Sequence, residues 1–380
     1  MYKQKIEQLL NQGENSGIEF KMPDVRPEVI AKEMVAFANA SGGTILIGVA
    51  DDGALMGIDT HKNYEEWSMN IARNNVIPPI NIEYSKVDVK GKTVVALEIP
   101  KGKDKPYQTN DFKYLIRVGS TNRVANSSEL MRLFQEAGVY HFDQTGVVKT
   151  SISDMNFTRL DNYFNQYNIS FSEDSNKEQL LINTDILSDQ GLVTVAGLMI
   201  FGINPQKYIH FGMISFAHFK GNELSDVLID KQNIEGNLDY QVETALSVIQ
   251  NNLLTPSVIE GAKRVDTRPM FPAKVFRELL VNAVVHRNYS ISGSAIRIFM
   301  FGDRIEFISP GKLPNTVTIE KITKGVSYSR NPIILKFMQN MNYIDKLGRG
   351  LPMVIAEAKT LGKKVDFEEA GEEFKVILYL

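Results

Sequence analysis

Gly13-Glu-Asn-Ser-Gly-Ile-Glu-Phe-Lys21 is the segment that decides the fold of the N-terminal third, together with a second run, Phe37-Ala-Asn-Ala-Ser-Gly-Gly-Thr-Ile-Leu-Ile-Gly-Val-Ala-Asp-Asp-Gly53. An extended chain in the first segment would place Glu19 and Lys21 on one side, because side chains alternate along a strand. In the second, Thr44–Val49 strongly favours a β-strand. The acidic residues that follow it would be exposed at the strand end.

Carboxylates and one lysine therefore gather around two predicted strands. Two or three carboxylates with a lysine can hold Mg²⁺ or Mn²⁺ and position water against a phosphodiester. Oxygen ligands of this kind suit those metals and not zinc. In the alternative interpretation, Glu19 and Lys21 are paired surface charges beside an edge strand, and Gly42-Gly43 is a simple turn.

Together the two segments resemble the Schlafen/AlbA-like nucleic-acid-binding module of many prokaryotic proteins and of the Schlafen family. The resemblance covers about the first third of the chain and implies RNA or DNA as partner. The resemblance to Schlafen-type endoribonucleases implies three acidic residues that hold a metal ion. Glu14 and Glu19 match two of them, and Asp51 is preferred over Asp52 as the third. Lys21 would stabilise charge or orient water.

The composition is that of a globular protein. The 380 residues are 43 % hydrophobic and 23 % charged, with a net charge of −3. The absence of cysteine excludes disulfides, zinc–thiolate sites and cysteine nucleophiles. No window approaches the ~20 apolar residues of a membrane span, and the first residues lack the uninterrupted apolar stretch of a signal peptide. We therefore expect a cytoplasmic protein without a membrane partner.

Positive charge is concentrated between Lys86 and Arg123, with nine Lys/Arg against four Asp/Glu. Arginines and hydroxyls at a turn suit phosphate contact. The alternative is a solvated loop that aids solubility. The predicted nucleic-acid contacts are Lys101, Lys103, Lys105, Arg117 and Arg123.

The order of predicted elements indicates an α+β protein. We expect a nucleic-acid-binding module over residues 1–138, a connecting α+β segment over 139–265 and a nucleotide-binding α/β sandwich over 266–380. Within the connecting segment, the uniformly apolar Leu192–Gly202 must be buried. We find no catalytic constellation there.

A second constellation lies on the predicted helix Arg277–His286. Glu278, Asn282 and His286 stand at i, i+4 and i+8 on one face. Such a polar stripe is expensive to bury unless it has ligands. Glu278 could polarise water, and Asn282 could hold Mg²⁺ beside a nucleotide phosphate. A histidine at this position is more often a hydrogen-bonded structural residue than a catalyst.

This helix looks like the N-box of the GHKL ATPases, and two further matches follow in order. The hairpin Ala295–Gly311 ends in Ser309-Pro-Gly311, where the superfamily has Asp-x-Gly with the Asp contacting adenine. Gly348-Arg-Gly350 resembles the glycine-rich box that opens a helix under the phosphates. ATP with Mg²⁺ is the implied cofactor. A serine removes the carboxylate acceptor, although a water-bridged serine could still serve.

The pairing of these modules resembles a prokaryotic family of predicted ATP-binding transcriptional regulators. Our leading hypothesis is a nucleic-acid-binding protein with a nucleotide-responsive domain and a metal-dependent nuclease centre. The alternatives are a non-enzymatic, ATP-gated DNA-binding regulator and a scaffold with both sites inert. Because GHKL domains often pair, we expect a homodimer by analogy. We read Arg330 as a loop anchor or a phosphate contact.

Overall fold

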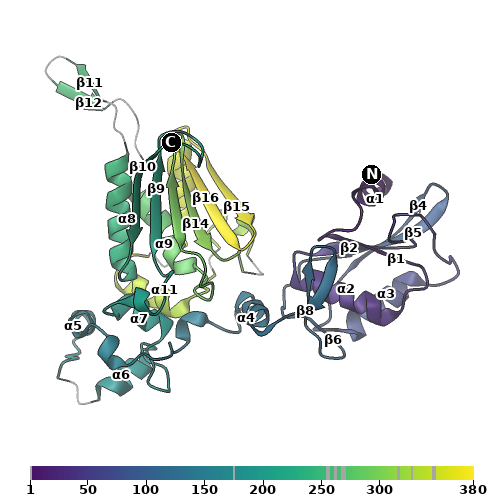
Figure 1. Cartoon of the computed structure of the whole chain (residues 1–380), viewed down its shortest axis with the longest axis horizontal. Coiled ribbons are helices and arrows are strands. Elements are labelled where there is room, and N and C mark those ends of the chain that lie inside the picture. The colour runs from purple at the N-terminus through teal and green to yellow at the C-terminus, as the bar shows by residue number, and fades with distance from the viewer. Residues whose placement is uncertain are drawn as a thin grey trace. The chain divides into compact units, whose positions relative to one another are not determined.

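The computed structural model describes residues 2–173, 176–253, 257–260, 263–266, 271–314, 317–326, 328–344 and 348–380. The chain divides into two compact units, unit 1 over residues 1–140 and unit 2 over residues 141–380 (Figure 1). Both units combine helices with sheets, which confirms the α+β class. None of the described helices has the length and apolar character needed to cross a membrane.

Unit 1 is built on a four-stranded sheet in the order β1-β2-β5-β4. Its strands are β1 (Ile18–Lys21), β2 (Gly43–Ile47), β4 (Glu83–Val89) and β5 (Lys92–Ile99). β1 and β2 are parallel, with Glu19 opposite Ile45, and the other pairs are antiparallel. Phe20 packs in the core on one face of the sheet with Ile6 of α1 (Tyr2–Gln12), while Ile45 packs on the other face under α2 (Pro27–Asn39). Because side chains alternate along β1, Glu19 and Lys21 point to the α2 face.

The rest of unit 1 surrounds this sheet. The remaining elements are α3 (Tyr64–Asn74), β3 (Val76–Ile77), β6 (Gln108–Thr109), the hairpin β7 (Leu115–Val118) and β8 (Thr121–Val124), and α4 (Ser127–Glu136). Asn126 caps α4 and forms a reciprocal capping box with Glu129.

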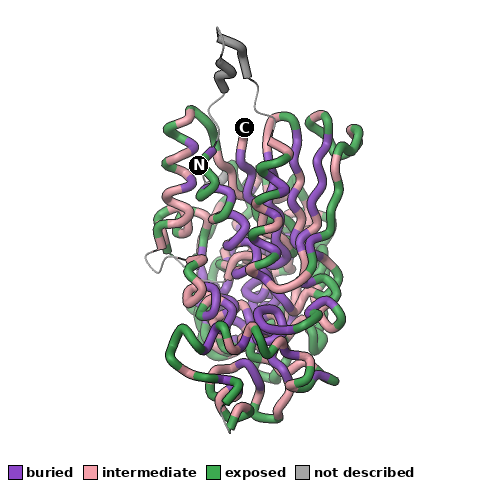
Figure 2. Tube along the Cα trace, turned by 90° about the vertical axis from the view of Figure 1, so that its left-hand side faces the viewer, coloured by how far each residue is buried: buried purple, intermediate pink, exposed green. Residues whose placement is uncertain are grey.

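Unit 2 contains a six-stranded sheet in the order β10-β9-β13-β14-β16-β15. The strands are β9 (Ile214–Phe219), β10 (Leu228–Ile234), β13 (Ile296–Met300), β14 (Arg304–Pro310), β15 (Val365–Ala370) and β16 (Glu373–Tyr379). Only the β9–β13 pair is parallel among the pairs of this sheet. One continuous core joins the sheet to α8 (Leu238–Asn252), α9 (Ala273–His286) and α12 (Gly350–Thr360). Figure 2 shows buried stretches running along these strands and helices.

Shorter elements complete unit 2. They are η1 (Phe142–Gln144), η2 (Ile152–Asp154), α5 (Phe157–Asn165), α6 (Lys177–Asn183), α7 (Val195–Phe201), η3 (Pro205–Lys207), β11 (Ser257–Glu260), β12 (Lys263–Asp266), α10 (Ile319–Thr323) and α11 (Pro332–Asn340). Every residue of α7 is buried, as the apolar run Leu192–Gly202 predicts.

The second expected domain boundary, between residues 265 and 266, does not separate two cores. β9 and β10, from the expected connecting segment, belong to the same sheet as β13 to β16. The reason is the parallel pairing of β9 with β13, which places Ile214 opposite Ile296. Local sequence patterns do not report a pairing between strands so far apart in the chain.

Candidate functional site

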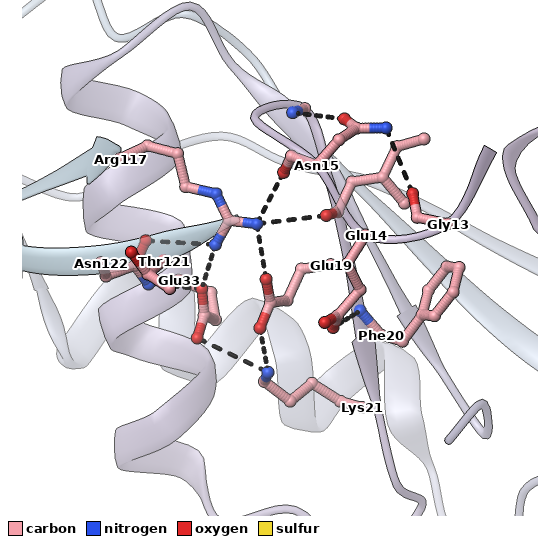
Figure 3. Close-up of polar contacts among 12 residues, drawn as sticks. Gly13, Glu14, Asn15, Glu19, Phe20, Lys21, Glu33, Arg117, Thr121 and Asn122 are labelled. Carbon is pink, nitrogen blue, oxygen red and sulfur yellow. Dashed lines mark hydrogen bonds and ion pairs between the residues drawn. The ribbon is translucent and has the colours of Figure 1, made fainter. Parts of the chain in front are cut away.

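Unit 1 holds a buried ionic cluster on the α2 face of its sheet, made of Glu19, Lys21, Glu33, Arg117 and Asn122 (Figure 3). Glu19 is 6 % exposed and pairs with the ammonium group of Lys21. Its Oε2 atom also lies 2.6 Å from Nη2 of Arg117. Two of the residues predicted from the first segment thus lie together, as the alternation along β1 requires.

Glu33 is the member of this cluster that the sequence did not reveal. Its carboxylate lies 3.6 Å from Nζ of Lys21 and 3.3 Å from Nη1 of Arg117, and it accepts a hydrogen bond from the Asn122 amide. Glu33 is one of the buried residues of α2, and the other buried residues of that helix are almost all apolar. A carboxylate on the apolar face of a helix needs a cationic partner. The position of Glu33 on this face is the sequence feature that could have predicted such a partner.

Arg117 is the centre of the cluster and is not an exposed phosphate contact. Its side chain is 1 % exposed. Nη2 donates to the carbonyl oxygens of Asn15, at 2.7 Å, and Ile18, at 3.1 Å, and the guanidinium stacks over Phe37 at 4.8 Å. The prediction of a phosphate contact here is therefore wrong. β7 turns the side chain inward, where it compensates two carboxylates.

Charge coupling shifts the pKa values of two members. Burial alone would lower the pKa of Lys21, but its hydrogen bond to Glu19 and the charges of Glu33 and Glu14 outweigh burial and raise it. Burial and the neighbouring Glu19 charge raise the pKa of Glu33, against the cations and Asn122. Lys21 therefore stays charged at neutral pH.

The other predicted acids have separate local roles. Glu14 accepts a hydrogen bond from the backbone N–H of Phe20 at 2.9 Å. Asp51 is exposed in a turn, and Asp52 accepts from the N–H of Ala54 at 2.9 Å. Among the described residues, no three acidic or histidine side chains are grouped so that they could hold a metal. The expected set of Glu14, Glu19 and Asp51 is not brought together.

The predicted basic loop is only partly available to a ligand. Lys105 is 4 % exposed, and its ammonium group donates to Ala40 O and to the Glu136 carboxylate, each at 3.0 Å. Lys105 is therefore a structural residue, and its prediction as a phosphate contact is wrong. Lys103 is exposed and Lys101 is half-buried. Burial of Lys105 leaves this loop with less free charge than its sequence suggests.

A groove lies beside the ionic cluster, between α2 and the β7–β8 hairpin. Glu19, Glu33 and Arg117 are among its lining residues. Apart from the exposed Val124, its exposed lining residues are basic or carry hydroxyls, namely Lys32, Lys113, Ser120, Thr121 and Arg123. Arg123 is 48 % exposed and forms a two-point ion pair with Glu129, with Nη1 at 2.8 Å from Oε2. That hydrogen bond raises the pKa of Arg123.

Unit 2 encloses a cavity of about 200 Å³ between α9, the strands β14 and β16, and the start of α12. All of the predicted nucleotide-binding residues line this cavity, namely Glu278, Asn282, Ser309, Gly311, Gly348 and Gly350. The lining is otherwise largely apolar and includes Phe307 and Phe374. Residues from three separate parts of the chain therefore converge on one space.

Glu278 and Asn282 form the polar pair at the α12 end of the cavity. Asn282 Nδ2 donates to Glu278 Oε1 at 2.8 Å, which leaves the Asn282 carbonyl oxygen for another partner. A side chain at Gly350 would place its Cβ atom 1.6 Å from Glu278 Oε1. A side chain at this position would therefore displace the Glu278 carboxylate.

Ser309 stands where the GHKL pattern has an aspartate. Its hydroxyl donates to the Ala283 carbonyl of α9 at 2.9 Å, so its remaining lone pairs can only accept. Gly311 has φ of +119°, and a Cβ atom there would lie 2.1 Å from Nη1 of Arg330. Arg330 donates to the carbonyls of His286, at 3.4 Å, and Lys312. These bonds are those of a loop anchor.

Two further residues contribute polar atoms to the cavity. His286 is half-buried beside the cavity, and desolvation, with a smaller contribution from the Arg330 charge, lowers its pKa to about 4, so the ring is neutral at pH 7. Tyr328 was not predicted. Its buried hydroxyl has no hydrogen-bond partner among the described residues, and burial raises its pKa. A tyrosine hydroxyl of this kind can donate to a ligand.

Two segments of the chain match known protein families. Residues 14–126 match the family described as "Schlafen, AlbA_2", and residues 293–378 match "Putative ATP-dependent DNA helicase recG C-terminal". The chain thus carries an N-terminal Schlafen/AlbA-like domain and a C-terminal RecG-like, ATPase-type domain. Both point to a nucleic-acid-related protein. None of the curated proteins matches the chain.

Two solved structures are similar to this chain. The crystal structure of the DIP2311 protein from Corynebacterium diphtheriae is 19 % identical over 99 % of this chain and 79 % of that chain, with a TM-score of 0.47. The solution structure of the N-terminal domain of a RecG-related protein from Nitrosomonas europaea is 21 % identical over 32 % of this chain and 88 % of that chain, with a TM-score of 0.24. At these TM-scores neither structure supports a functional argument.

Proposed function

We propose that this protein binds nucleic acid through unit 1 and ATP with Mg²⁺ through the cavity of unit 2, as a non-cleaving, nucleotide-responsive regulator. The observation that carries the proposal is the convergence of the predicted nucleotide-binding residues on one cavity. The match of residues 293–378 to an ATPase-type family supports it independently. By resemblance, we further propose a GHKL-type ATP site and a cytoplasmic homodimer.

In the cavity, each polar residue has a proposed role toward the nucleotide. Ser309 would accept a hydrogen bond from the base, since its proton is already donated to Ala283 O. The carbonyl oxygen of Asn282 would hold Mg²⁺, which prefers oxygen ligands. Gly348 and Gly350 would let the phosphates approach the backbone at the start of α12. Bound Mg²⁺ would neutralise phosphate charge beside Glu278.

For nucleic acid, we propose the groove of unit 1 in place of the Lys101–Lys105 loop. Lys32, Lys113 and Arg123 would contact phosphates from the exposed side of the groove, where the hydroxyls of Ser120 and Thr121 also lie. Buried carboxylates lie beneath them and repel phosphate, so the backbone would follow the basic side chains.

Binding without cleavage is favoured over the nuclease hypothesis by the pairing of the carboxylates. Glu19 and Glu33 are compensated by Lys21 and Arg117, and Asp51 lies apart from them in an exposed turn. Metal-dependent cleavage remains the second candidate, because two carboxylates and a lysine do lie beside the groove. There Mg²⁺ or Mn²⁺ would have to compete with Lys21 and Arg117 for Glu19.

Nucleotide binding is tested by calorimetric titration of the full chain with ATP and Mg²⁺. We expect saturable binding that Asn282→Ala weakens at least tenfold and that is lost with EDTA. The matched control is Asn183→Ala, because Asn183 also hydrogen-bonds a residue four positions earlier, Gln179, but lies on the exposed face of α6. Absence of ATP binding by the wild type would reject the proposed site.

The nucleic-acid proposal is tested with labelled single-stranded RNA, structured RNA and duplex DNA, with Mg²⁺ or Mn²⁺ and with or without ATP. We expect binding without cleavage, weakened by Lys32→Gln/Lys113→Gln and unchanged by Lys86→Gln, an exposed lysine outside the groove. Each lost phosphate contact should reduce the salt dependence by about one unit of slope. Cleavage that Glu19→Gln abolishes would establish the nuclease instead.

A further inference from the structure

The segment that enters unit 2 from residue 141 is fastened to the first turn of α11. Asp143 is fully buried, and its Oδ2 atom accepts hydrogen bonds from the N–H groups of Ile333, at 2.7 Å, and Ile334, at 3.0 Å. These N–H groups belong to the unpaired set at a helix start, so the carboxylate caps α11 from outside the helix.

A second bond joins the same segment to the residue two before α11. His141 Nδ1 lies 3.1 Å from the carbonyl oxygen of Arg330. Because a carbonyl can only accept, the Nδ1 atom must carry the proton. His141 therefore binds residue 330, and Asp143 binds residues 333 and 334. These residues belong to one stretch, 328–334, which we call the cavity wall.

On its other side, the cavity wall faces the nucleotide cavity and α9. Tyr328 and Arg330 line the cavity. Arg330 donates to the carbonyls of His286 and Lys312, and Asn331 Nδ2 donates to those of Val285, at 2.8 Å, and Arg287, at 2.7 Å. The same few residues therefore touch the ligand space, the helix carrying Asn282, and the entering segment.

We propose that nucleotide binding in the cavity and anchoring of residues 141–144 are coupled through the cavity wall. The inference rests on the proposed function, since it requires a nucleotide in the cavity. A nucleotide that contacts Tyr328 favours the wall in the position that His141 and Asp143 hold. By reciprocity, the anchors must then raise nucleotide affinity, although neither residue lines the cavity.

The test uses the full chain with ATP and Mg²⁺ as the probe. In hydrogen exchange, we expect ATP to slow exchange in the peptide covering residues 141–150. In calorimetric titration, we expect Asp143→Ala and His141→Ala each to weaken ATP binding by roughly five- to tenfold, within the usual range of coupling between sites. His141 is only half-buried, so His141→Ala keeps the test open if Asp143→Ala fails to fold.

The matched control is Asp154→Ala. Asp154 also accepts a hydrogen bond from the backbone N–H of Ser151, at 3.0 Å, and from the Tyr208 hydroxyl, at 2.7 Å, but neither partner belongs to the cavity wall. Its loss should leave ATP affinity unchanged. Wild-type affinity in both anchor variants, with no ATP effect on exchange, would overturn the coupling and leave the cavity site intact. No ATP binding by the wild type would overturn both proposals.

Discussion

The ionic cluster of unit 1 and the cavity of unit 2 both contain residues that short motifs singled out in the sequence, yet they use those residues in opposite ways. In unit 1 the carboxylates of Glu19 and Glu33 meet Lys21 and Arg117, so the charges compensate one another. In unit 2 the polar atoms line a partly open pocket among apolar side chains. A motif alone does not separate a structural network from a binding site. Which of the two a motif forms depends on the side chains that other parts of the fold place opposite it.

The strongest test of this comparison is Arg117→Ala. It removes one of the two cations that Glu19 and Glu33 share, and breaking a buried ion pair typically destabilises a protein by about 3–5 kcal/mol. The fluorescence of Trp67, the single tryptophan of the chain, reports the unfolding of unit 1 in urea. The exposed Arg123 is the control, because a surface ion pair contributes about 0–1 kcal/mol. Equal effects of the two alanine variants would mean that the cluster is not structural.

Because of His286, we expect the stability of unit 2 to depend on pH. Its pKa is lowered to about 4 in the folded protein by burial, from an ordinary value of 6.5. Below pH 6.5 the His286 ring binds a proton in the unfolded chain, whereas in the folded chain it stays neutral down to about pH 4. The free energy of unfolding therefore falls as the pH drops from 6.5 to 4. The loss approaches about 3 kcal/mol. The measurement is urea unfolding of unit 2, followed by circular dichroism at several pH values. The fall in the free energy of unfolding between pH 6.5 and pH 4 should disappear in His286→Gln. It should persist in His210→Gln, since His210 is exposed.

Gly350→Ala tests whether the cavity depends on close backbone approach. The added methyl would lie 1.6 Å from Glu278 Oε1, so the carboxylate or the start of α12 must move. We expect ATP affinity to fall roughly tenfold, about 1.4 kcal/mol. Gly293→Ala is the control, because a Cβ atom there has no neighbour within 4 Å. Unchanged affinity in Gly350→Ala would place the phosphates elsewhere.

Tyr328→Phe should have the smallest effect. It removes only the buried hydroxyl that has no partner among the described residues. If ATP accepts a hydrogen bond from it, affinity should fall by roughly 1 kcal/mol, about fivefold. If no ligand atom meets the hydroxyl, removing it should slightly raise stability and leave affinity unchanged in the same titration.

Local sequence patterns were sufficient for much of the fold. The β-forming run Thr44–Val49 contains most of β2, and the hairpin turning at Gly302-Asp303 joins β13 to β14 as predicted. The helical spacing of Glu278 and Asn282 also placed both side chains on the cavity. In each case the information lies within one element, or in motifs whose order along the chain matches a known pattern.

What the sequence missed depends on contacts between distant elements. Glu33 joins the ionic cluster only because α2 packs over β1, and Lys105 is buried only because α4 supplies Glu136. From the sequence alone, Lys105 and Arg117 are both expected at the surface, since an isolated charge is rarely buried. The partner that permits burial lies far away in sequence, so no local window contains it.

The parallel pairing of β9 with β13 also has a consequence for biosynthesis. The sheet of unit 1 needs only residues up to Ile99, whereas the sheet of unit 2 cannot be completed until β16, ending at Tyr379, has left the ribosome. Domains generally fold as units during synthesis, N-terminal first. Unit 1 should therefore gain protease resistance in chains stalled soon after residue 140. In chains stalled between β10 and β13, the edge of β9 that later pairs with β13 is still unpaired.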